Sequence, residues 1–162
     1  MPFLRFLILL SLVVWVGSLA FFPVVAQTAF SVLPVTHLAG LVVRNALIEL
    51  HWMGIVSGIV FLFGSLAYDW LSRGSTQFLS ARNVLVACML ALILTSQFEI
   101  IPRMETLRTS IQDFDSLPPN DPIRITFNAL HVWSTRLEAG VLLLGLIVVG
   151  ITSNLLSTSK SS

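Results

Sequence analysis

Two sets of polar residues in this sequence have the types and spacing that could do chemistry. The first is Arg124, His131 and Glu138, which are seven residues apart, so that each lies within about 20° of its predecessor around an ideal helix. A histidine and a carboxylate on one helix face can form a ligand, ion or proton site, or can pair with charges on a neighbouring helix.

The second set is His37, Arg44 and His51, again at intervals of seven residues. An arginine seven residues before a Leu-His pair occurs in both sets, in "RNALIELHW" and in "RITFNALHVW". Either the match is a chance likeness of a few residues or it is the trace of two related hairpins, since internal repeats are common in transport proteins.

Composition places both sets in a membrane protein. The 162 residues are 56% hydrophobic and only 10% charged, whereas about 25% of the residues in an ordinary soluble domain are charged. Such a chain cannot solvate its own surface in water, and its expected partner is the lipid bilayer. A formal net charge of +1 provides no basic stripe for phosphates, so we expect no nucleic-acid partner.

Four stretches reach or approach the length of about 20 apolar residues that a membrane-spanning helix needs. They are residues 6–27, 50–70, 83–101 and 137–156. Because only helices and closed barrels satisfy the backbone in lipid, these spans predict one all-α domain, residues 1–162, an integral membrane four-helix bundle. We expect Glu99 and Pro102 to close the third span.

The first span could also be a cleavable secretory signal, since a basic residue precedes its apolar run. That run covers about 17 residues from Phe6 to Phe22, which is longer than the usual range of roughly 7 to 15 residues. We therefore expect a retained helix.

The lysines and arginines predict the orientation of the bundle. With the N-terminus inside, the inner segments hold four cations and one acid, a net charge of +3, namely Arg5, Arg73, Arg82 and Lys160 against Asp69. The outer segments hold five arginines and seven acids, a net charge of −2. Positive residues stay inside, so both termini should face the cytoplasm from the inner (plasma) membrane.

Two helices should extend beyond the membrane on the outer side. One begins near Thr36 and runs without a breaker into the second span. The other begins with Asp121 as N-cap and Pro122 at the first helical position, and runs into the fourth span. A short amphipathic outer segment should lie between the third and fourth spans, with an apolar stripe of Met104, Leu107, Ile111 and Phe114.

A polar cluster should form where these helices leave the membrane. We expect it to contain His51, Glu99, Arg103, His131, Arg136 and Glu138, with Arg44 and Arg124 further out. The cluster could lock the helix ends together through ion pairs, or it could bind a ligand, an ion or a proton. Water at the membrane rim lowers the cost of these charges, which favours the locking role.

Glu138 should have a cationic partner inside the bundle. An unpaired carboxylate at the start of the lipid-depth segment would cost several kcal/mol. Arg103 and His51 are the candidates at matching depth, and Arg44 lies a turn or two above them.

The remaining motifs give little support for catalysis. No serine, histidine and acid cluster and no phosphate loop stands out, and the single cysteine, Cys88, allows no disulfide within one chain. His51 and His131 could ligate a haem or a transition metal, although no close histidine pair has metal-ligand spacing. Gly54 and Gly58 match the small-residue motif that seats a neighbouring membrane helix, or else a second copy of the chain.

Four segments, in order, resemble the transmembrane protein 205-like family, a four-span domain of unknown function. They are "WVGSLAFFPVVAQTAFSVLP", "AGLVVRNAL", "EIIPRMETLR" and "FNALHVWSTRLEAGVLLLGL". The last matches the F-x-x-LH-x-x-S pattern of that family through Phe127, Leu130, His131 and Ser134. The resemblance implies a small four-helix membrane protein and transfers no reaction.

We therefore expect a non-enzymatic membrane protein without a cofactor, either a small transporter component or an accessory factor. The alternative is a haem- or metal-binding redox protein that uses His51 and His131. The sequence identifies no small-molecule or ion ligand, and it leaves open association with another copy or with another membrane protein.

Overall fold

The structure, a computed structural model, describes residues 2–111 and 116–158. The elements in chain order are α1 (Pro2–Val32), α2 (Thr36–Arg73), α3 (Ala81–Thr95), the π-helical turn η1 (Ser96–Ile100), α4 (Ile101–Thr109) and α5 (Pro122–Thr158). The segments α3, η1 and α4 follow one another without a break, so that the described chain forms four long rods. Phe114 of the predicted apolar stripe lies outside the described residues.

All four rods are long and apolar enough to cross a membrane. Many large apolar side chains also point outward, such as Phe63, which is 72% exposed, and Val13, which is 68% exposed. An outward apolar surface suits lipid, and the predicted all-α four-helix membrane bundle is confirmed. The chain is an integral, multi-pass membrane protein.

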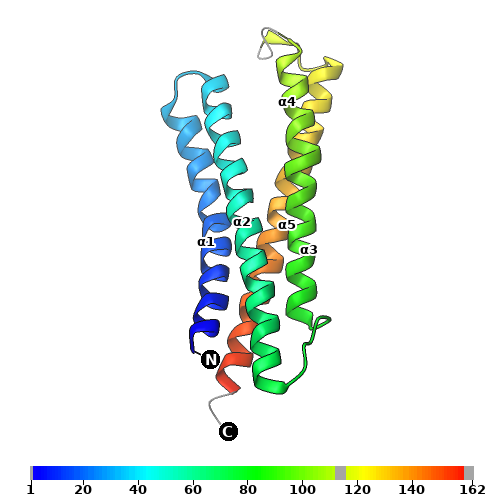
Figure 1. Ribbon diagram of the computed structural model, residues 1–162. Coiled ribbons are helices and arrows are strands. Elements are labelled where there is room, and N and C mark those ends of the chain that lie inside the picture. The colour runs from blue at the N-terminus through cyan, green and yellow to red at the C-terminus, as the bar shows by residue number, and fades with distance from the viewer. Residues whose placement is uncertain (1, 112–115, 159–162) are drawn as a thin grey trace.

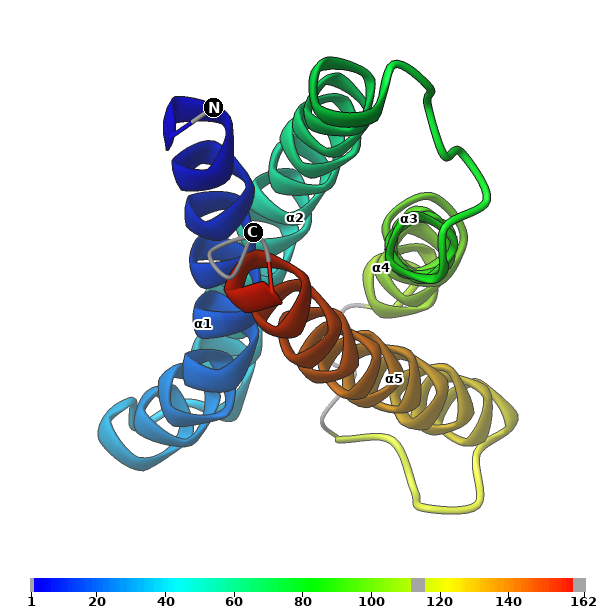
Figure 2. The same ribbon diagram turned by 90° about the horizontal axis from the view of Figure 1, so that it is seen from below.

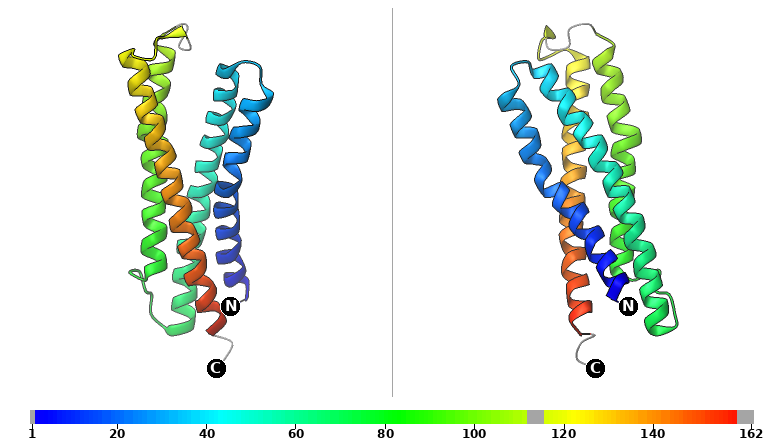
Figure 3. Two further views of the ribbon diagram at one scale, coloured as in Figure 1. Left: turned by 180° about the vertical axis from the view of Figure 1, so that it is seen from behind. Right: turned by 60° about the vertical axis from the view of Figure 1, so that its left-hand side comes forward.

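The rods form two hairpins, α1 with α2 and α3–η1–α4 with α5 (Figure 1). The described ends of α1 and α5 that lead to the two termini lie at the same end of the bundle, which we call the terminal end. The hairpins come close together near this end and diverge toward the opposite, far end, as the further views also show (Figures 2 and 3).

The third rod continues past Glu99 and Pro102, where we expected this helix to close. Pro102 has no backbone N–H and would disturb an ordinary α-helix. The preceding turn is π-helical, with the Ile101 N–H donating to the Ser96 carbonyl oxygen, five residues back. We attribute the uninterrupted rod to this wider turn, which accommodates the proline. The rod therefore spans 29 residues, and it extends toward the far end in addition to the two helices predicted to do so.

The predicted helix starts agree with the structure. The Ile123 N–H donates to Asp121 Oδ1 at 2.8 Å, and Pro122 is the first residue of α5. The other long helix, α2, begins at Thr36.

Trp15 of α1 fills the centre of the bundle and is fully buried. It can do so because α2 presents glycines to it. A Cβ on Gly54 would lie 2.7 Å from Trp15 Nε1 and 2.8 Å from Ile93 Cδ1. A Cβ on Gly58 would lie 2.7 Å from Leu90 Cδ2. Both glycines therefore seat α1 and α3 against α2 within one chain.

Gly54→Ala should lower the thermal stability of the detergent-solubilised protein by about 1–3 kcal/mol, because the new methyl group overpacks a buried indole. The control is Gly17→Ala, since a Cβ on Gly17 meets nothing within 4 Å. We expect the control to match or slightly exceed the wild type in melting temperature. Equal melting temperatures for the two variants would contradict this account of the core.

Candidate functional site

One imidazole joins the two hairpins. His51 of α2 is fully buried, and both of its ring nitrogens contact the second hairpin. Its Nδ1 lies 2.7 Å from Gln97 Oε1 in η1, and its Nε2 lies 2.7 Å from Glu138 Oε1 of α5. The structure thus pairs Glu138 with one of the two candidates that the sequence suggested.

The π turn supplies one side of this site. Gln97 lies within η1, next to Ser96, which is fully buried. A π turn holds an extra residue compared with an α turn, and such turns occur frequently at functional sites. The turn that carries the rod past Pro102 is therefore also the turn that places an amide against His51.

The hydrogen-bond pattern leaves one proton to be shared between two side chains. Because Gln97 Oε1 is an acceptor, Nδ1 of His51 donates to it. A close contact between Nε2 and Glu138 Oε1 then needs a proton between them, as an imidazolium with a carboxylate or as a neutral imidazole with a carboxylic acid. Both arrangements carry no net charge, which lowers the cost of burial.

Unused hydrogen-bonding capacity remains on Glu138 itself, on the residue before Gln97 and on Trp15 in the core. Glu138 Oε2, Ser96 Oγ and Trp15 Nε1 are buried and have no hydrogen-bond partner within the described parts of the chain. A buried polar atom without a partner costs about 1–3 kcal/mol. Glu138 Oε2 could therefore bind water or another small polar species beside the shared proton.

Two further polar contacts join the hairpins toward the far end. Arg44 Nε lies 3.0 Å from Glu105 Oε2. Arg108 NH2 donates to the His37 carbonyl oxygen at 2.8 Å and lies 3.0 Å from His37 Nδ1. His37, Arg44 and His51, which the sequence placed on one face of α2, thus all contact the second hairpin. We call these three levels of contact the polar ladder.

Five of the eight residues of the predicted cluster make contacts away from His51 and Glu138 or are exposed, and the cluster as a whole stays a prediction. Glu99 and Arg103 pair with each other at 2.7 Å on the surface, with side chains 58% and 68% exposed. Arg136 lies over the ring of its exposed neighbour Trp133. His131 is exposed.

Arg124, the last of the eight, donates to the Leu117 carbonyl oxygen. The centre of the site is therefore His51 with Glu138, and Arg44 belongs to the next level of the polar ladder. Of the predicted cluster, only His51 and Arg44 belong to the first hairpin, and the two hairpins diverge toward the far end (Figure 1).

Sequence reasoning missed Gln97 and a buried ion pair at the terminal end. Arg82 NH2 lies 2.7 Å from both carboxylate oxygens of Asp69, and these side chains are only 5% and 3% exposed. Both residues had entered the charge count as separate charges of the inner segments, without a prediction that they pair. Their positions directly beside apolar runs were the available signal, because a charge next to a long apolar run can turn inward when it finds a partner.

The metal and haem alternative finds no assembled ligand set in this geometry. No group of three or more His, Cys, Asp or Glu residues that could hold a metal ion occurs among the described residues. Both ring nitrogens of His51 are already engaged. A metal or haem iron could therefore bind His51 only after one of these 2.7 Å contacts breaks.

Comparisons with known proteins identify a family and no closer relative. No curated protein and no solved structure matches the chain. A family model described as "Domain of unknown function (DUF4149)" matches residues 10–113, a region that contains His51 and Gln97 and stops before Glu138. This four-helix membrane protein belongs to the DUF4149 family.

Proposed function

We propose that this protein is a non-enzymatic, proton-coupled component of a small transport system, with His51 and Glu138 as its proton site. The observation that carries the proposal is the fully buried His51 held at 2.7 Å from Glu138 between two hairpins. Ionisable residues buried in membrane proteins are costly and often mark proton and ion pathways. Two amide side chains in place of His51 and Glu138 would hold the same helices together by hydrogen bonds, but they would carry no titratable proton.

The position of the pair suits exchange with water. Exposed tryptophans are typical of membrane boundaries. Trp52 follows His51 directly in the middle of α2, and Trp70 lies near the C-terminal end of this helix; both are exposed. At 1.5 Å per residue these two residues are about 27 Å apart, close to the ~30 Å hydrocarbon layer. His51 therefore belongs at the far boundary, where the polar ladder leads from it toward water.

Loss of the shared proton would change the contact between the hairpins. Without that proton, the Nε2 lone pair of His51 and a Glu138 carboxylate oxygen would face each other across 2.7 Å. These two acceptors repel, so the pair must separate or rearrange. The neighbouring Arg44–Glu105 contact is about one-third exposed and contributes only about 0–1 kcal/mol, so it opposes such a movement weakly. Proton occupancy and hairpin contact are thereby coupled.

The same proposal places the terminal end in the cytoplasm of a cell with an inner membrane. Support comes from the positive charge of the inner segments and from the start of α1 and the described end of α5, which lie at the same end of the bundle (Figure 1). The motif likeness to the transmembrane protein 205-like family adds support for a membrane component of this kind. The likeness identifies no substrate.

Cysteine labelling tests the orientation. In a Cys88→Ala background, a membrane-impermeant maleimide should label Ser116→Cys in intact spheroplasts. It should label Ser75→Cys, in the connection between α2 and α3, only after permeabilisation. The reverse pattern would place the termini outside.

Proton flux into proteoliposomes tests the function. With a potassium-diffusion potential and a trapped pH-sensitive dye, the wild type should acidify the lumen faster than protein-free vesicles. Glu138→Gln should reduce the flux to that of empty vesicles, because the amide keeps a hydrogen bond to His51 but cannot exchange a proton. Its melting temperature should stay close to that of the wild type.

Glu99→Gln is the matched control, since Glu99 is a carboxylate in an exposed pair, and it should keep the wild-type flux. Equal flux from the wild type and Glu138→Gln, or no wild-type flux above empty vesicles, would contradict the proposal. An absorption spectrum of the same preparation checks the alternative function. A Soret band that disappears in His51→Ala or His131→Ala would replace the proton site with a haem site.

A further inference from the structure

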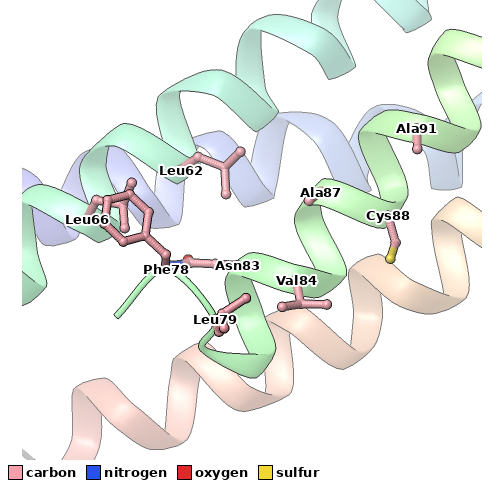
Figure 4. Close-up of a pocket in the computed structure, with 9 residues that line it drawn as sticks. All are labelled: Leu62, Leu66, Phe78, Leu79, Asn83, Val84, Ala87, Cys88 and Ala91. Carbon is pink, nitrogen blue, oxygen red and sulfur yellow. The ribbon is translucent and has the colours of Figure 1, made fainter. Parts of the chain in front are cut away.

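A groove opens sideways between α2 and α3 in the half of the bundle near the terminal end. It encloses a cavity of about 460 Å³. Its wall on α3 is made of small side chains, among them Ala87, Cys88 and Ala91, and Leu62 and Leu66 of α2 lie across from them (Figure 4). Phe78 and Leu79, from the connection between the helices, line its end. The groove is therefore mostly apolar along α3, and its polar lining residue, Asn83, donates to the Gln77 carbonyl oxygen at 3.0 Å.

A second, more polar cavity adjoins this end of the groove. It measures about 430 Å³ and shares Phe78 and Leu79 with the groove, while Thr76, Gln77 and Ser80 complete its lining. Ser80 occupies the N-cap position of α3 but makes no side-chain capping bond. Its Oγ is buried and has no hydrogen-bond partner in the described portion of the chain. An unsatisfied hydroxyl thus lies where the apolar groove begins.

The charge beside this polar cavity is positive. Arg73, the last residue of α2, is exposed and stands three positions before Thr76. The nearby Asp69 is already neutralised by Arg82 at 2.7 Å. The first turn of α3 adds the partial positive charge of a helix N-terminus. An anionic group is therefore the complementary ligand for this end of the groove.

The length of the groove matches one leaflet of a bilayer. Its lining along α3 runs from Asn83 to Ala91, eight residue steps, or about 12 Å at 1.5 Å per residue. Half of the hydrocarbon layer is roughly 15 Å. A transmembrane helix from a partner would need a groove along the whole bilayer, whereas one acyl chain needs a groove of this length.

We propose that the groove is a binding site for one anionic phospholipid of the leaflet at the terminal end. One acyl chain lies between α2 and α3, against Ala87 and Ala91. The phosphate group lies at the polar cavity, where it accepts a hydrogen bond from Ser80 Oγ and is attracted by Arg73. This site is separate from the His51–Glu138 pair and does not depend on the proton-coupled function.

Cys88 provides a built-in probe, because it is the single cysteine of the sequence and lies exposed in the groove. The rate of maleimide labelling of Cys88 would be measured in delipidated, detergent-solubilised protein. The additives would be phosphatidylglycerol or phosphatidylcholine with identical acyl chains. We expect both lipids to slow labelling, and phosphatidylglycerol to bind with about fivefold higher affinity than phosphatidylcholine. This is the preference expected for one arginine near an anionic lipid.

Three variants separate the parts of the proposal. Arg73→Gln should remove the preference between the lipids, and Arg73→Lys should retain most of it. Ala91→Phe should abolish protection by both lipids, because the ring occupies the place of the acyl chain. Arg103→Gln, which changes an exposed arginine at the far end, is the control and should behave like the wild type.

Equal protection by the two lipids, or protection by neither, would overturn the proposal. Protection that rises with protein concentration and not with lipid would assign the groove to a second copy of the chain, which would also overturn it. Melting temperatures of the variants show that each one is folded.

Discussion

The contact of His51 with Gln97 and Glu138 is the interaction on which the relation between the two hairpins depends. Lipid tails are as apolar as the helices, so burial of apolar surface gives little reason for hairpins to associate in a membrane. Tight packing and interhelical hydrogen bonds must hold them together. Separating the hairpins at His51 would leave several buried polar atoms without partners, at about 1–3 kcal/mol each. A single imidazole therefore links the packing of the bundle to the protonation of Glu138.

Contacts of different strength lie on the two sides of this imidazole. Toward the terminal end, Trp15 packs against glycines, and Asp69 pairs with Arg82 out of contact with water. Toward the far end, the hairpins diverge and the polar ladder is partly exposed. Close packing resists deformation, whereas exposed ion pairs exchange readily with water. Relative movement of the hairpins should thus pivot near the terminal half and open the far half.

The sequence was sufficient for the architecture and for part of the site. Span lengths identified the bundle, and seven-residue spacing placed His37, Arg44 and His51 on a face that does meet the second hairpin. Spacing on one helix says nothing about the distance to its neighbours, so the divergence of the hairpins and the exposure of His131 could not be foreseen. The passage of the third rod through Pro102 depends on a π turn, which leaves no periodic signal in the residues. Gln97 lies in this π turn, so the periodicity of the residues could not predict that it faces His51.

Solid-state NMR of the protein in bilayers, with ¹⁵N-labelled histidine and ¹³C-labelled glutamate, tests the central claim most directly. A dipolar contact should join His51 Nε2 to the side-chain carboxyl carbon of Glu138, and His51→Gln should remove it. The His51 ring should also exchange with water more slowly than the exposed ring of His131. A His51 ring that exchanges like His131 and shows no contact with Glu138 would contradict the shared-proton pair and the coupling of the hairpins built on it.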